Sequence, residues 1–120
     1  MITHQQLVSR LKKDPSTINI NSLQADIIHM TMGICGEAGE LLDAVKKWVI
    51  YEQPLDCGNV IEELGDLEFF MEGLRQALNI ERSVIIDKNI EKLHKRYGGK
   101  YSNEAAKERK DKEVYAPDSD

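Results

Sequence analysis

Long apolar runs are missing from this sequence: no window of its 120 residues approaches the roughly 20 consecutive apolar residues that a helix needs to cross a bilayer. The first residues also lack the charged segment followed by an apolar one that marks a secretory signal. We therefore expect no association with a membrane and a location in the cytoplasm.

Proline and cysteine are scarce, and there is no excess of positive charge. Three prolines and eight glycines are typical of a helix-rich soluble protein. Cys35 and Cys57 lack the spacing of metal ligands, so we interpret them as reduced packing residues. The net charge of −5 argues against binding a nucleic acid polymer, because such binding needs many cationic contacts to phosphates. A single small polyanion is still compatible with this charge if the basic residues cluster.

Apolar residues recur at helical spacing in four segments. They predict helices over residues 3–13, 22–52, 59–78 and 81–97, the first with a candidate cap at Thr3. Stop signals stand at Asp14-Pro15, Gln53-Pro54, Asn79 and Gly98-Gly99. No segment alternates with period two, so we expect no strand. The length predicts one all-α domain over residues 1–114. The charged end of the chain, which is poor in apolar residues, predicts a mobile tail over 115–120.

Two predicted helices each carry a pair of carboxylates at i, i+3 spacing. On a helical wheel of 22–52, Glu37 lies on the shoulder of the apolar arc, and Glu40 shares its strip with His29 and two glycines. On the wheel of 59–78, Glu63 lies inside the apolar arc and Asp66 at its edge.

A carboxylate among core positions is costly unless it is paired, hydrogen-bonded or bound to a metal. Carboxylates at this spacing also repel one another unless a cation joins them. Hard oxygen ligands favour magnesium, or manganese in its place. The alternative is that these acids form salt bridges to lysine or arginine of a neighbouring helix.

The predicted helix over 81–97 supplies the opposite charge. Lys92, Arg96 and Asn89 border its apolar arc, where they are suited to face a phosphate chain. The alternative is that the two basic residues are ordinary surface side chains whose aliphatic stems cover apolar area.

Three segments resemble the MazG-like, all-α nucleoside triphosphate pyrophosphohydrolases: GEAGELLDAVKKW, EELGDLEFF and KNIEKLHKRY. The family pattern is EExxE, a spacer, then ExxD. Here Glu37 and Glu40 fill the last two glutamates of the first block, and Glu63 and Asp66 follow a spacer of 22 residues. Gly36 stands where many members carry the first glutamate. The resemblance covers about residues 22–112.

The resemblance implies an antiparallel helical bundle that forms a homodimer or homotetramer. It implies hydrolysis of an NTP or dNTP between the α and β phosphates, with magnesium held by the four acids. Pyrophosphate is then expected to lie near a set of polar side chains, namely Lys92, Arg96, Asn89 and Lys47, and the nucleotide near His29. Two alternatives stay open, namely an enzyme of the related all-α dUTPase branch and a non-catalytic helical interaction module.

Overall fold

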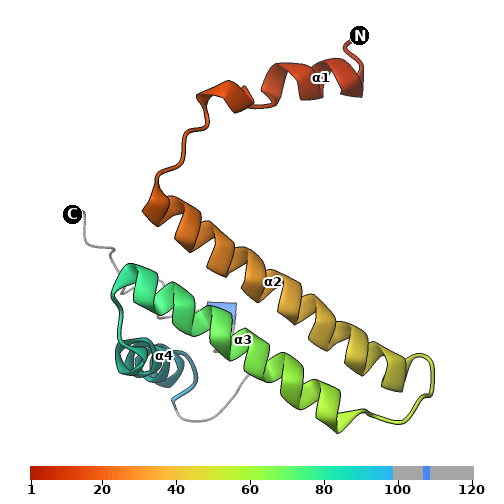
Figure 1. Cartoon of the computed structure of the whole chain (residues 1–120), viewed down its shortest axis with the longest axis vertical. Coiled ribbons are helices and arrows are strands. Elements are labelled where there is room, and N and C mark those ends of the chain that lie inside the picture. The colour runs from red at the N-terminus through yellow and green to blue at the C-terminus, as the bar shows by residue number, and fades with distance from the viewer. Residues whose placement is uncertain (99–106, 109–120) are drawn as a thin grey trace.

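A computed structural model describes residues 1–98 and 107–108 of the chain (Figure 1). The elements in order are α1 (His4–Leu11), a 3-10 turn η1 (Pro15–Thr17), α2 (Ser22–Val49), α3 (Cys57–Leu78) and α4 (Arg82–Tyr97). The expected all-α class is confirmed for these residues, which contain no strand. Within the same part of the chain, every helix is too short or too polar to span a bilayer. The predicted domain end at 114 and the tail over 115–120 lie outside the described residues.

Side-chain caps set the beginnings of three helices. Thr3 and Gln6 form a capping box at α1, and Asn21 and Gln24 form another at α2. Asp56 accepts a hydrogen bond from the Asn59 N–H at 3.0 Å, so α3 begins at Cys57, two residues earlier than the apolar pattern predicts.

Left-handed residues and a proline end the helices. Asn79 and Gly98 adopt φ values of 55° and 58° at the ends of α3 and α4, as the sequence predicts. α2 ends at Val49, three residues before its predicted end, because Glu52 turns the chain with a φ of 55° and Pro54 cannot continue a helix.

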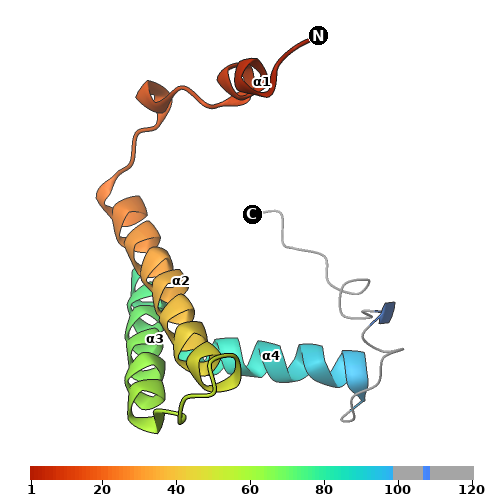
Figure 2. The same ribbon diagram turned by 90° about the vertical axis from the view of Figure 1, so that its right-hand side faces the viewer.

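The centre of the fold is an antiparallel pair formed by α2 and α3, and no other two described elements pack along one another extensively (Figures 1 and 2). The backbones approach closely at two glycines. A Cβ on Gly33 would overlap the Phe70 ring, and one on Gly73 would overlap the Met30 sulfur. These glycines therefore serve a neighbouring helix rather than a ligand.

One face of each paired helix is half-buried, and Ala44, with 7% of its surface exposed, is the only buried residue in the described part of the chain. The radius of gyration is 20.0 Å, against about 14 Å for a compact chain of this length. α4 points away from the helix pair, and α1 stands off the end of α2 at the far end of a linker (Figure 2). The single chain therefore leaves most of its apolar surface uncovered.

Several side chains that the wheels place in the core are exposed: Ala38, Val45, Trp48, Leu64, Leu78, Ile86, Ile90 and Leu93. The expectation of burial is wrong for the single chain, because a two-helix pair covers one face of each helix and leaves the flanks open. The same geometry leaves Cys35 and Cys57 as exposed free thiols, so the interpretation of them as packing residues is also wrong.

Candidate metal centre

Three of the four predicted acids meet between α2 and α3. Glu37, Glu63 and Asp66 each offer a carboxylate oxygen, and these oxygens all lie within 4.8 Å of one another. Glu37 and Glu63 are half-buried on the facing sides of the two helices, and Asp66 lies one turn along α3 at the exposed edge. The helix pairing therefore brings together acids that are 26 residues apart in the sequence.

Glu63 has the most unusual environment of the three. Its Oε2 is buried and has no hydrogen-bond partner, which is costly for a carboxylate oxygen. The neighbouring Glu37 carboxyl, loss of solvent, and the charges of Glu37, Glu40 and Asp66 together raise the pKa of Glu63 to about 7. The neighbouring Glu37 carboxyl is the largest of these causes.

The cluster has the properties of a cation site. Among the described residues, no ion pair joins a lysine or arginine to Glu37, Glu63 or Asp66, so the alternative of a salt bridge to a neighbouring helix finds no support within this part of the chain. A hard divalent cation would both relieve the repulsion and give the Glu63 oxygen a partner. The residues present therefore fit magnesium or manganese.

Glu40 lies at the rim of this group. It is exposed, and its oxygens are not among those that lie within 4.8 Å of one another. Its charge nevertheless contributes to the raised pKa of Glu63, so it is close enough to act on the cluster. Its predicted role as a ligand stays a prediction.

The predicted phosphate-binding residues are not gathered at the acids in the single chain. Lys92 and Asn89 belong to α4, which does not pack along the helix pair, and neither has a hydrogen bond or ion pair to the three acids. Arg96, on the same helix, lies over the Tyr97 ring at 5.9 Å. Lys47 Nζ lies 3.0 Å from Asp43 Oδ2, and this partner raises the pKa of Lys47 above its ordinary value.

His29 lies on α2 two turns before Glu37, a rise of about 12 Å along the helix. Its ring packs edge-on against Phe70 with centroids 6.4 Å apart. Phe70 in turn contacts Gly33, so His29 lies beside the point where the backbones of α2 and α3 approach closely. Its predicted place near the nucleotide stays a prediction.

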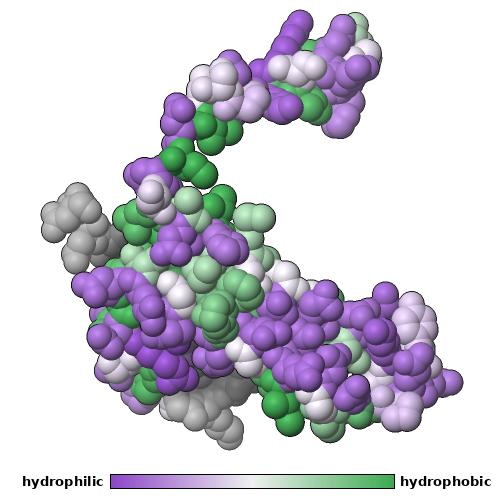
Figure 3. Space-filling model, viewed as in Figure 1, coloured by the Kyte–Doolittle hydropathy of each residue, from purple (hydrophilic) through white to green (hydrophobic). Residues whose placement is uncertain are grey.

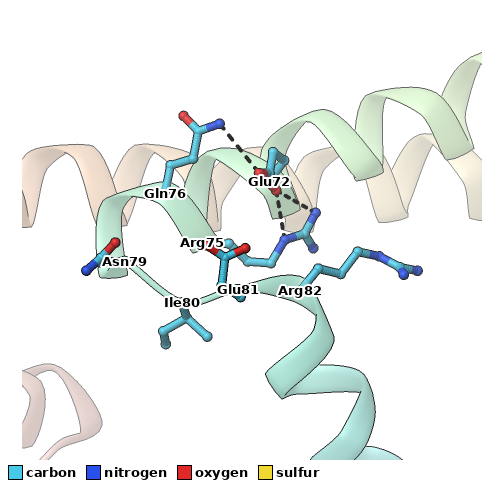
Figure 4. A pocket seen from close by; sticks show the side chains of 7 residues that line it. All are labelled: Glu72, Arg75, Gln76, Asn79, Ile80, Glu81 and Arg82. Carbon is cyan, nitrogen blue, oxygen red and sulfur yellow. Dashed lines mark hydrogen bonds and ion pairs between the residues drawn. The ribbon is translucent and has the colours of Figure 1, made fainter.

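The sequence reasoning missed a second polar group, at the corner between α3 and α4. Arg75 Nε donates to Glu72 Oε2 at 2.9 Å, and only 11% of the Arg75 side chain is exposed (Figure 4). Gln76 extends its amide toward the other Glu72 oxygen at 3.5 Å. These side chains border a pocket of about 150 Å³ at the corner between α3 and α4. Its lining consists of Glu72, Arg75, Gln76, Asn79, Ile80, Glu81 and Arg82. The i, i+3 spacing of Glu72 and Arg75 was the available signal.

Comparison with known proteins leaves the family open. No family model matches the chain, and neither does any solved structure. The chain is similar to the Gene 37 protein of Mycobacterium phage L5, with 34% identity over 74 residues. The aligned region covers 57% of this chain and 63% of the phage protein, so the chain spans less than two thirds of that relative. The name of the phage protein states no activity.

Proposed function

We propose that this protein is a magnesium-dependent nucleoside triphosphate pyrophosphohydrolase of the MazG-like kind. It would cleave an NTP or dNTP between the α and β phosphates and release the monophosphate and pyrophosphate. One observation carries the proposal, namely the convergence of Glu37, Glu63 and Asp66 around a buried carboxylate oxygen that has no partner. A structural salt bridge would have supplied that partner, whereas a metal site leaves it to the ion.

Each acidic residue of the cluster has a role in the proposed reaction. Glu37, Glu63 and Asp66 hold the cation, with Glu40 at the rim. A bound divalent cation neutralises charge on phosphate oxygens and lowers the pKa of a bound water. A carboxylate of this group that is not engaged by the ion accepts the proton of the attacking water.

The bundle expected for such an enzyme is completed by a second copy of the chain. The exposed apolar side chains and the single buried residue among the described residues support this part of the proposal, because a lone chain leaves its helix flanks in water. In the resulting homodimer or homotetramer, Lys92, Arg96 and Asn89 of α4, together with Lys47, would lie near the departing pyrophosphate, and His29 near the nucleotide.

Pyrophosphate release from a mixed panel of ribo- and deoxynucleoside triphosphates tests the activity. The panel includes dUTP, and each reaction is run with magnesium and with EDTA. We expect release only with magnesium, and its loss in Glu63→Gln. The matched control is Asp26→Asn, which removes one exposed carboxylate charge from the same helix pair and keeps parental activity.

The outcomes separate the alternatives. Release confined to dUTP would assign the protein to the all-α dUTPase branch. A panel that shows no release with magnesium or manganese would overturn the enzymatic proposal and leave a helical interaction module. Equal activity in Glu63→Gln and the parent would show that the acid cluster is not the active site.

A further inference from the structure

Residues 1–13, here called the arm, form the most isolated part of the described structure. Its helix α1 packs along no other described element, and every residue of the arm is exposed. Figures 1 and 2 show α1 standing clear of the α2–α3 pair. A helix of eight residues is marginal in water without a packing partner. A surface outside its own helix pair is therefore needed to hold it.

The arm combines an apolar face with positive charge, which is the pattern of a helix that docks onto an acidic, partly apolar surface. Leu7, Val8 and Leu11 lie on one face, and Leu11 is 74% exposed. The arm carries three cationic side chains, Arg10, Lys12 and Lys13, and no acidic residue. The remaining residues of the chain carry thirteen basic against 21 acidic side chains, a net charge of −8. The arm therefore complements the rest of the chain in charge.

The linker holds the arm away from its own helix pair. Asp14 caps the 3-10 turn through a hydrogen bond from the Ser16 N–H at 3.0 Å, and the Thr17 hydroxyl donates to the Asp14 carbonyl at 2.7 Å. Lys12 and Ile18, on either side of this turn, have extended backbones. Apolar surface is visible on the linker ahead of α2 (Figure 3). Ile18 and Ile20, which belong to this segment, are exposed. Because these hydrogen bonds fix the conformation of the linker, they favour docking of the arm onto another molecule over folding of the arm back onto its own helix pair.

The outer face of α3 has the matching surface. Ile61 and Phe69 are exposed there, at 68% and 67%. Glu62 and Glu68 flank them, and among the described residues no hydrogen bond or ion pair engages either glutamate. α4 is a poorer match in charge, because it carries five basic side chains against two acidic ones, Asp87 and Glu91. The basic residues are Arg82, Lys88, Lys92, Lys95 and Arg96.

We propose that the arm docks onto the outer face of α3 in a second copy of this chain, with Leu7, Val8 and Leu11 on its apolar residues and the arm's cations beside Glu62 and Glu68. Two copies exchange arms reciprocally, as a two-fold dimer requires. This interface uses none of the acids of the cluster, so its failure is distinguished from failure of the proposed activity, which pyrophosphate release measures.

A charge swap tests the proposal. Variant A is Arg10→Glu with Lys13→Glu, and variant B is Glu62→Arg with Glu68→Arg. Sedimentation at micromolar concentration is expected to show a dimer or larger assembly for the parent. The dissociation constant of A alone, or of B alone, should rise by about tenfold or more. The one-to-one mixture should regain the parental constant, because A's acidic arm then meets B's basic α3 and B's basic arm meets A's acidic α3.

Controls keep the outcome clear. Lys88→Glu reverses one exposed charge on α4 and should leave the assembly unchanged. Far-ultraviolet circular dichroism checks that A and B keep their helices. A monomeric parent, an unaffected variant A, or a mixture that fails to regain association would overturn the proposal.

A crosslinking experiment identifies the contact directly. A carbodiimide joins lysine amines to carboxylates at zero length, and the parent is used as a mixture of ¹⁴N- and ¹⁵N-labelled chains. Mixed-isotope crosslinks from Lys12 or Lys13 to Glu62 or Glu68 are expected. Crosslinks of the arm confined to single-isotope peptides would show folding back. Flotation with phosphatidylserine vesicles that is lost in variant A, together with an unchanged assembly, would assign the arm to a lipid surface instead.

Discussion

Glu63 on α3 faces Glu37 on α2 with carboxylate oxygens within 4.8 Å of each other, and Glu37 is the main reason that the pKa of Glu63 is raised. One oxygen of Glu63 is buried there without a hydrogen-bond partner. Two facing acids without a cation oppose the pairing of the helices that carry them. The cost of this arrangement in the metal-free chain leads to the first two predictions.

Replacing Glu63 by glutamine should separate stability from function. In EDTA, Glu63→Gln should melt at the parental temperature or higher, because it removes a repelling charge. Magnesium should raise the melting temperature of the parent but not of the variant, since ligand binding to the folded state stabilises it. Turnover should fall by orders of magnitude. A variant that melts far lower in EDTA yet keeps near-parental turnover would identify Glu63 as a structural residue.

The metal-free parent should lose stability as pH rises. The pKa of Glu63 is about 7 in the folded chain against an ordinary 4.5, so the folded state binds the proton more tightly. The tighter binding of this proton stabilises the folded state. This contribution to the free energy of unfolding is fully present below pH 4.5 and is lost as pH rises through about 7. Melting temperatures in EDTA between pH 5 and 8 should fall more steeply for the parent than for Glu63→Gln. Parallel curves would contradict the prediction.

Two glycines on α2 should respond in opposite directions to alanine. Gly33→Ala places a methyl group against the Phe70 ring and should destabilise the chain by about 1–3 kcal/mol. Gly36→Ala has open space around its Cβ and should stabilise the helix by about 0.5–1 kcal/mol. Urea unfolding of both variants measures the difference. Equal effects would mean that the helices do not approach closely at Gly33.

The cations of α4 should matter for substrate and not for folding. Lys92→Gln should raise KM for the best substrate about tenfold or more, because a charged hydrogen bond to phosphate contributes about 1.5–3 kcal/mol. Lys88→Gln, on the same helix with a side chain that is 70% exposed, should leave KM unchanged. Steady-state kinetics of the two variants decide the point. If both behave as the parent does, α4 does not reach the substrate.

Local signals in the sequence predict the helices and the most important site residue. The stop at Asn79 and the cap at Thr3 follow from residue type, and Glu63 is found inside an apolar stripe because helical periodicity fixes its face. The start of α3 is missed because Asp56 caps it ahead of any apolar residue. On the helical wheel Glu37 lies at the edge of the apolar arc. It is half-buried in the structure because α3 crosses α2 on the side of Gly33 and covers it.

Tertiary placement is the part that the sequence does not predict. The direction of α4 depends on a short connection at Asn79 and Ile80 rather than on a repeating pattern, so its position relative to the acids could not be read from periodicity. The burial of Trp48 and Leu64 fails for a related reason. Periodicity shows which side chains share a face but not whether a neighbour covers that face.

Ala44 is the single buried residue in the part of the chain that the structure describes, which affects how the protein must be handled. A chain that covers so little of its own apolar surface gains little by folding alone, so in the assembly that we propose folding and association become one bimolecular process. Its midpoint of unfolding then shifts with dilution, as it does for obligate dimers. Measurements made at nanomolar and at micromolar concentration would describe different populations, and protein concentration belongs with temperature and pH among the conditions that define its stability.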